Sequence, residues 1–177
     1  MNYKELFNLM HPDFFKAPWI RDKSEDAVFS ELILDLKNET PAASIEPCPD
    51  NITFGFYQGD LKKLEPLVAR VDEGWVQFYD GKNRVFCAYD GDNIAAFCII
   101  DDWGQVQGLR IAGPGCVGTV PEYRKQGIGL VMVRKATEII QKEGYDLSWI
   151  HYTHLGKWYS KLGYHTVLQW NCKGFID

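Results

Sequence analysis

The chain has 177 residues, a length that suits one domain, and 46% of them are apolar, which is enough for a substantial core. Its formal net charge of −5 argues against nonspecific binding to nucleic acid. No apolar run approaches membrane-spanning length, and the N-terminus has neither an apolar signal core nor a small-residue cleavage site. These features predict a soluble, cytoplasmic protein with no nucleic-acid or membrane partner.

The five cysteines are scattered, odd in number and without a C-x-x-C pair. This pattern argues against a disulfide framework and against a zinc site, so no metal is expected. None of the five has the basic surroundings that mark a nucleophile. Four of them fall in strand-like segments and are expected to be small core residues: Cys87, Cys98, Cys116 and Cys172.

Residues 1–50 predict a helical N-terminal extension. Apolar side chains recur at helical spacing from Tyr3 until Pro12 interrupts the pattern. A second helix is predicted with Ser24 as its N-cap, because apolar side chains share one face as far as Leu36. Residues 40–50 contain three prolines and predict a linker or surface loop.

Residues 51–177 predict a mixed α/β domain. Gly59-Asp60 is expected to cap a helix, and Asp90-Gly91-Asp92 to turn a hairpin. Gly113-Pro-Gly115 is expected to break the chain before the next strand, and Gly144 to end the longest helix. The predicted order is β-α-β-β-β-α-β-α-β, with strands at 52–57, 84–89, 93–100, 116–120, 147–152 and 164–172, and helices at 61–71, 129–143 and 155–162.

The segment from Val117 to Gly129 predicts a pyrophosphate site. A short apolar strand leads through Pro121 into a tight turn and the start of a helix. That order gathers several unpaired backbone N–H groups at the positive end of the helix dipole. Gly127 and Gly129 remove side chains that would keep a phosphate from the backbone, and Arg124 adds positive charge.

The spacing Arg124-x-x-Gly127-x-Gly129, directly after Val-Pro-Glu-Tyr, resembles the acetyl-coenzyme A signature of the GCN5-related N-acetyltransferase superfamily. The block from Trp158 to Tyr164 resembles that family's second signature, aromatic-Tyr-x-x-x-Gly-aromatic. The resemblance covers roughly Asp50 to the C-terminus. It implies the fold of that family, a mixed and largely antiparallel central sheet.

By this resemblance acetyl-coenzyme A is the co-substrate. The pantetheine arm would lie along the strand that ends at Gly118-Thr119-Val120, where Gly118 suits a bulge that splays this strand from residues 147–152. The turn that follows would wrap the pyrophosphate. The expected coenzyme-binding residues are Gly118, Thr119, Val120, Arg124, Lys125, Gln126, Gly127, Ile128, Gly129 and Leu130.

Other nucleotide sites fit less well. Gly127-Ile-Gly129 is half of a dinucleotide fingerprint, but Met132 holds the position of the third glycine. The phosphate-binding sequence Gly-Lys-Ser/Thr is absent from the chain.

Tyr159 stands where the family commonly has the general acid that protonates the departing sulfur. A phenol with a pKa of about 10 and a thiol of about 8.5 make that transfer feasible. A packing tyrosine is the alternative. The family often has an Asn seven residues before this Tyr, and here that position is Tyr152.

The base that activates the acceptor is left open by the sequence. Glu122, His151, and Asp101 or Asp102 are candidates, and water is another. The acceptor pocket is also open, although aromatic residues are numerous enough to build a wall around a cation. These residues, which suit a plain core equally well, are Trp75, Phe78, Tyr79, Trp103, Trp149 and Tyr152.

The sequence thus predicts a cytoplasmic enzyme that moves an acetyl group directly from acetyl-coenzyme A to an amine of a small molecule or peptide, with no covalent enzyme intermediate. Two alternatives remain: an acyltransferase that uses another acyl group or an alcohol, and a coenzyme A-binding module without turnover. Family members often pair through their last strands, so a homodimer through residues 164–172 is possible by analogy.

Overall fold

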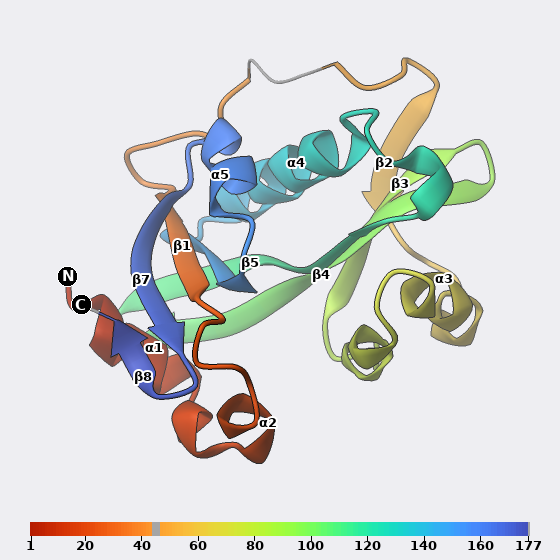
Figure 1. The fold of residues 1–177 in the computed structure, drawn as a ribbon. Helices are drawn as coiled ribbons and strands as arrows, with labels where there is room; N and C mark the ends of the chain where they lie inside the picture. The colour runs from red at the N-terminus through yellow and green to blue at the C-terminus, as the bar shows by residue number, and fades with distance from the viewer. Residues whose placement is uncertain (44–46, 177) are drawn as a thin grey trace.

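The computed structural model describes residues 1–43 and 47–176, so residues 44–46 of the predicted linker lie outside the described part. One sheet of eight strands runs through the described residues in the order β2-β3-β4-β5-β6-β1-β7-β8 (Figure 1). All neighbouring strands are antiparallel except β5 and β6, which are parallel. The predicted fold class, a mixed and largely antiparallel sheet with a helix near the N-terminus, is therefore confirmed.

The elements have the following bounds. The strands are β1 Phe29–Asp35, β2 Ile52–Phe56, β3 Arg84–Asp90, β4 Asn93–Val106, β5 Leu109–Thr119, β6 Leu147–Thr153, β7 His165–Asn171 and β8 Gly174–Ile176. The α-helices are α1 Tyr3–Met10, α2 Pro18–Arg21, α3 Glu65–Ala69, α4 Ile128–Lys142 and α5 Gly156–Tyr159. Short 3-10 helices lie at η1 Phe14–Lys16, η2 Leu61–Lys63, η3 Glu73–Phe78, η4 Pro121–Tyr123 and η5 Ser160–Leu162. No helix of the described chain is long and apolar enough to cross a membrane.

Helices cover both faces of the sheet. On one face α4 and α5 pack against the strands, and on the other α1 and α2 lie below β1 and β7, while α3 and η3 lie below β3 and β4 (Figure 1). The longest helix, α4, buries an apolar stripe that includes Val133, Ala136 and Ile140. It ends as predicted, before Gly144, whose φ of +80° suits a residue without a Cβ.

The largest difference from the sequence prediction is β1. Residues 29–35, predicted to be part of a helix that begins at Ser24, form a strand between β6 and β7. Leu32 and Leu34 pack in the core on the α4 face and Ile33 in the core on the α1 face. A strand buried on both faces has a continuous apolar run, and such a run also contains the i, i+4 spacing of a helix.

A second difference lies in β5, which continues through Gly113-Pro-Gly115 instead of breaking there. These glycines mark close approaches and not an interruption. A Cβ on Gly113 would stand 1.8 Å from the Trp149 carbonyl oxygen, and one on Gly115 would stand 2.1 Å from Asp101 Oδ2. Glycine at these two positions lets the Trp149 backbone and the Asp101 carboxylate approach the strand. The sequence alone does not distinguish this use of glycine from a turn.

The cysteines of the described chain are free thiols. Cys87 and Cys98 are buried in strands, as expected, and Cys116 is half-buried in β5. Cys172 lies after the end of β7, outside the strand predicted for it. Among residues 1–43 and 47–176, no three His, Cys, Asp or Glu side chains gather as a group that could hold a metal ion.

Candidate functional site

A slot between β5 and β6 is the first feature of the site. The two strands pair only at Ile111 with Leu147 and at Ala112 with Ser148 along the described chain, although β5 runs on to Thr119. The edge of β5 beyond Ala112 therefore has backbone groups without a strand partner on that side. An extended chain that carries amide groups can add to such an edge.

A bulge in β5 lies next to this edge. Ile99 of β4 pairs with Gly115 and Phe97 with Gly118, so three steps of β5 oppose two of β4. Cys116 takes up the extra residue with a φ of +45°. The bulge lies before Gly118, where the sequence predicted it. Glycine is required at position 118 for another reason, because a Cβ there would stand 2.5 Å from the Phe97 ring.

The turn between β5 and α4 is the second feature. Lys125 has a φ of +63° and Gly127 one of +74°, so two residues directly before α4 have left-handed backbone conformations. Within the described chain, none of the backbone N–H groups from Lys125 to Leu130 donates to another backbone group. Six successive unpaired N–H groups at the positive end of a helix form a concave site for an anion.

Two contacts hold this turn against β5. The Arg124 Nε donates to the Thr119 carbonyl oxygen over 3.2 Å. A Cβ on Gly129 would stand 2.6 Å from Thr119 Oγ1, so only glycine allows the helix to begin this close to the strand. The sequence prediction placed Gly118 to Val120 and Arg124 to Leu130 at one site, and the structure brings them together at the end of the slot.

Glu122 lies beside this turn but not in a position to act as a base. Its exposed carboxylate forms an ion pair with Arg70. That hydrogen bond lowers the pKa of Glu122 below its ordinary value. A carboxylate stabilised in its charged form is a weak proton acceptor.

Tyr159 packs on the α4 face of the sheet, at the end of α5. Its neighbour Trp158 approaches the start of α4, with ring atom Cζ2 3.7 Å from the position of a Cβ on Gly129. Among the described residues, none forms a hydrogen bond with the Tyr159 hydroxyl, and this leaves it available to a ligand. Adjacent residues of α5 thus supply the phenol and a ring beside the predicted phosphate-binding turn.

Burial shifts the acidity of Tyr159. It raises the pKa of this phenol well above the ordinary value, with smaller contributions from Tyr164, Cys98 and Cys116. Burial also raises the pKa of the neighbouring Cys116 thiol, to about 12. A leaving thiolate in the same surroundings would also lack solvation, so its pKa would rise as well. The difference in pKa between the Tyr159 phenol and the leaving thiol therefore changes less than either pKa alone.

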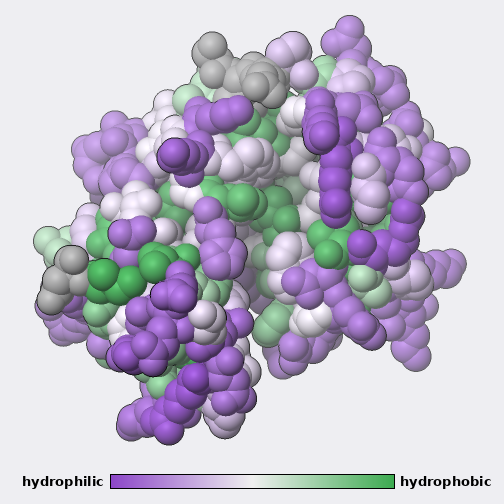
Figure 2. All heavy atoms as spheres, in the orientation of Figure 1, coloured by the Kyte–Doolittle hydropathy of each residue, from purple (hydrophilic) through white to green (hydrophobic). Residues whose placement is uncertain are grey.

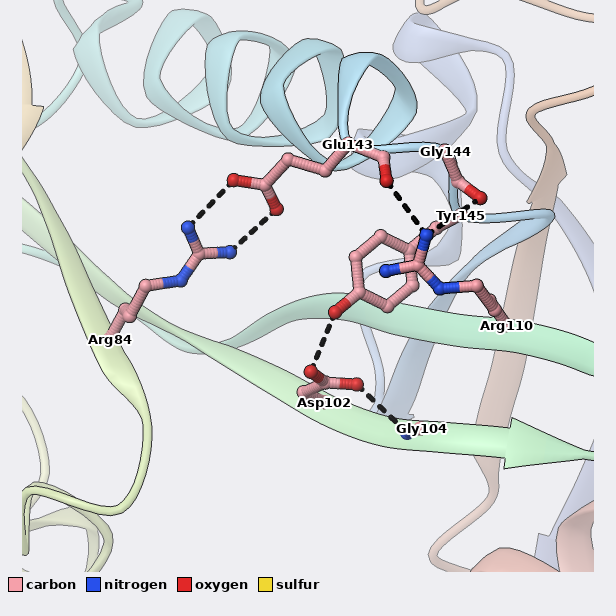
Figure 3. Close-up of polar contacts among 7 residues, drawn as sticks. All are labelled: Arg84, Asp102, Gly104, Arg110, Glu143, Gly144 and Tyr145. Atoms are coloured by element: carbon pink, nitrogen blue, oxygen red, sulfur yellow. Dashed lines mark hydrogen bonds and ion pairs between the residues drawn. The ribbon is translucent and has the colours of Figure 1, made fainter.

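Asp102 was a candidate base together with Asp101. It belongs to a hydrogen-bond network at the C-terminal end of α4 (Figure 3). Its Oδ2 accepts the Tyr145 hydroxyl at 2.6 Å. Arg84 forms two hydrogen bonds of 2.7 Å with Glu143, and Arg110 donates to the Glu143 carbonyl oxygen at 2.8 Å. These bonds tie the C-terminus of α4 to β3, β4 and β5, where cationic side chains also complement the helix dipole.

Asp101 points to the opposite face and lies beside the slot. Its Oδ1 accepts Asn83 Nδ2 at 3.1 Å, and its Oδ2 covers Gly115 of β5. Burial raises the pKa of Asp101 to about 6, although the nearby His151 lowers it. Asp101 and His151 thus remain candidates for proton transfer, while Glu122 and Asp102 have other partners.

Tyr152, which stands where the family often has Asn, faces away from the α4 side. Its ring stacks on Trp170 with centroids 5.1 Å apart and planes at 13°, and its φ is +55°. The Tyr152 N–H donates to Oε1 of Glu31 at 3.1 Å. Sequence reasoning missed Glu31, and the available signal was a lone acidic residue inside the apolar run Phe-Ser-Glu-Leu-Ile-Leu.

The aromatic residues that the sequence offered as a wall do not form one wall. They divide between two cores on the same face, and Phe78 is about half exposed. Trp103, Trp149 and Tyr152 belong to the core below β1 and β6, whereas Trp75 and Tyr79 belong to the core below β3 and β4.

Comparison with known proteins places this geometry in a family. A family model described as an acetyltransferase (GNAT) domain matches residues 81–166, from the hairpin of β3 and β4 to the start of β7. Residues 81–166 thus match the acetyltransferase (GNAT) domain that the sequence motifs resemble. Acetyltransferase domains of this superfamily use acetyl-coenzyme A as co-substrate and act in general on amine-bearing acceptors.

Solved acetyltransferase structures share the fold. The GCN5-related glucosamine N-acetyltransferase region of a fungal multi-domain GH3 β-N-acetylglucosaminidase has 22% identity and a TM-score of 0.67, covering 84% of this chain and 21% of that one. GCN5-related N-acetyltransferases from Sphaerobacter thermophilus and Kribbella flavida have 17% and 16% identity with TM-scores of 0.59 and 0.56. The matches cover 85% and 81% of this chain and 53% and 56% of theirs.

The chain therefore spans from about a fifth to just over half of the length of these three proteins. At such identities the likeness is one of fold. No curated protein sequence matches the chain.

Proposed function

We propose that this protein transfers an acetyl group directly from acetyl-coenzyme A to an amine, with Tyr159 as the general acid for the leaving thiolate. The observation that carries the proposal is the run of unpaired N–H groups from Lys125 to Leu130 at the end of an open strand edge. A diphosphate with an amide-bearing arm matches both parts of this site. The amides would hold the pyrophosphate, and the edge of β5 would pair with the arm.

The transfer needs two proton movements. The amine nitrogen attacks the thioester carbonyl carbon, the C–N bond forms, and the C–S bond breaks with its electron pair on sulfur. The Tyr159 hydroxyl would supply the proton that sulfur takes up, and solvent would return a proton to the phenolate. A primary amine enters mostly as an ammonium, and removing its proton at neutral pH costs about 4 kcal/mol. A base on the acceptor side is therefore required.

The acceptor is proposed to be an amine of a small molecule or peptide. The fungal structure with a similar fold is a glucosamine N-acetyltransferase region, so an amino sugar is one acceptor to test. A different acyl group, or an alcohol acceptor, would use the same coenzyme site. A binding module without turnover is the alternative outside enzymes, and it would have no chemical need for a phenol at position 159.

The variant Tyr159→Phe tests the proposal. It should leave the Kd for acetyl-coenzyme A within about twofold, because the phenol ring still packs, and lower kcat at least about tenfold. Tyr57→Phe is the matched control, since the Tyr57 hydroxyl donates to the Asp60 carbonyl oxygen in the loop after β2. Unchanged turnover in Tyr159→Phe would remove this residue from the mechanism.

A further inference from the structure

The residue Glu31 is fully buried in the middle of the sheet, with a carboxylate that accepts several hydrogen bonds. Trp170 Nε1 donates to Oε1 and Trp149 Nε1 to Oε2, each over 2.7 Å. The Tyr152 N–H also donates to Oε1. Two indoles and an amide are donors only, so they fix this side chain as an acceptor.

The fourth partner of Glu31 is His151. Its Nδ1 lies 3.1 Å from Oε1 and 3.0 Å from Oε2. Because Glu31 already serves as the acceptor for three donors, Nδ1 must carry the hydrogen of this contact. The Nε2 atom is then left with a lone pair when the ring is neutral. This assignment of the tautomer follows from the partners alone.

Nε2 is free to meet a ligand. It makes no hydrogen bond with another residue of the described chain, and 21% of the His151 side chain is exposed. The ring itself is held by packing. His11 stacks on it with centroids 4.0 Å apart and planes at 15°, and Phe14 meets it edge-on at 5.3 Å.

His151 stands beside the slot. The parallel register of Ile111 with Leu147 continues to Gly113 and Trp149, whose close approach is shown by the 1.8 Å between a Gly113 Cβ and the Trp149 carbonyl oxygen. Gly115 and His151 each lie two residues further along their strands. Asp101 covers Gly115 from β4, so two ionisable side chains flank this part of the slot on one face.

Tyr159 and these two groups lie on opposite faces of the sheet. Tyr159 packs in the core on the α4 face, while His151 contacts Phe7 and Phe14 of the core on the α1 face. An acceptor amine that enters on the α1 side would therefore have the base His151 on its own side of the thioester carbonyl and the acid Tyr159 on the far side. This separation keeps the incoming and the departing protons apart.

We propose that His151 is the general base of the transfer, that Glu31 is the residue that positions it, and that Asp101 attracts the cationic amine. This inference rests on the proposed acetyl transfer and assigns its base. His151 Nε2 takes one proton from the bound ammonium, and the free amine attacks. The buried Glu31 carboxylate stabilises the imidazolium, which then releases its proton to solvent. Nitrogen loses its second proton to solvent, and solvent returns one proton to the Tyr159 phenolate after Tyr159 has protonated the sulfur.

The groups that face His151 come from three other segments. They are Glu31 of β1, Asp101 of β4 and His11 after α1. Burial lowers the pKa of His11 to about 3, with a further contribution from His151, so His11 stays neutral and does not repel the imidazolium near neutral pH. Asp101 and His151 are therefore the two groups whose contributions the variants have to separate.

The test measures kcat/KM against pH for the whole protein and its variants, by release of thiol from acetyl-coenzyme A with an accepted amine. His151→Gln should lower kcat/KM roughly 100-fold at pH 7.5 and remove the decline at acid pH that is expected of the wild type. Asp101→Asn should mainly raise the KM for the amine and keep that decline. His165→Gln, an exposed histidine of β7, is the matched control and should match the wild type.

Two more variants guard against a misfolded protein. His151→Gly should regain activity when imidazole is added, because a small base can enter the space, whereas a packing defect would not respond. Glu31→Gln should lower kcat at least about tenfold and respond little to imidazole, as expected of a positioning residue. Full activity of His151→Gln, or loss of the acid decline in Asp101→Asn instead, would overturn the assignment. A wild type that acetylates no amine would overturn the proposed function itself.

Discussion

At the scale of single residues, the backbone at Lys125 and Gly127 sets the direction of the amides in the turn. Both residues have a positive φ, and of the two only the glycine adopts this conformation without strain. The sequence predicted this turn well, because glycine spacing and the strand-to-helix order are local signals. It did not predict the partners of Glu31, because those partners come from β6 and β7, far along the chain.

Replacing Gly127 by Ala should weaken the binding of acetyl-coenzyme A at least about tenfold, because the added Cβ strains the turn and displaces its amides. Gly91→Ala is the matched control. Gly91 also has a positive φ, of +57°, and a Cβ there would meet nothing within 4 Å. Both variants should lose about 1 kcal/mol of stability. Equal coenzyme affinity in the two, by calorimetric titration, would mean that the turn does not hold the coenzyme.

Asp101 gives a pH-dependent prediction at the same scale. Burial raises its pKa from 3.8 to about 6, so the folded state binds this proton more tightly than the unfolded state. Its ionisation therefore destabilises the fold as pH rises from about 4 to 6. This ionisation should lower the free energy of unfolding of the wild type by about 3 kcal/mol. Asp101→Asn has no such loss, so it should be more stable than the wild type at pH 8. Urea unfolding of both proteins at pH 4 and pH 8 measures the difference, and parallel curves would contradict the burial of the charge.

At the scale of elements, the N-terminal segment packs against the proposed site, where His11 stacks on His151. α1 was predicted from its apolar spacing, and Asn2 caps it by accepting the Glu5 N–H at 3.2 Å. The strand β1 was missed because the same apolar run satisfies both a helix and a strand buried on two faces. Only its pairing with β6 and β7, which is a property of the folded sheet, decides between the two.

His11, which follows α1, should make this segment sensitive to acid. Burial lowers its pKa from 6.5 to about 3, so stability is complete above pH 6.5 and is lost as pH falls toward 3. The loss should reach several kcal/mol at pH 3 and be absent in His11→Phe, whose ring can still stack on His151. Asp101 acts in the opposite direction over part of this range, so the informative quantity is the difference between wild type and variant. An equal acid dependence in the two would contradict the prediction.

At the scale of the whole molecule, the sheet joins the two segments that the sequence divided at residue 50. β1 contributes Ile33 to the core that also holds Trp149 and Trp170. The face drawn in Figure 2 is largely polar, with apolar side chains visible in patches between polar ones. β7, for which pairing with a second copy is possible by analogy, is bonded to β1 on one side and β8 on the other. β8 covers only Gln169 to Asn171, so on that side residues 165–168 have no strand partner in the described chain, and pairing with a second copy stays a prediction.

Removal of residues 1–35 should abolish cooperative folding, because β6 and β7 then lose their common partner and the core below them is exposed. Removal of residues 174–177 is the control, since β8 is a three-residue edge strand. That shorter protein should unfold cooperatively with a Tm only a few degrees lower. A cooperative transition in the chain without residues 1–35 would instead support residues 51–177 as an independent domain.

The measurement that tests the central claim most directly is release of thiol from acetyl-coenzyme A in the presence of amines. Glucosamine, polyamines, aminoglycosides, amino acids and short peptides form the panel, and mass spectrometry identifies the acetylated product. The account predicts release that depends on one class of amine, with a matching acetamide. No release with any amine, together with an unchanged Tm in acetyl-coenzyme A, would contradict it.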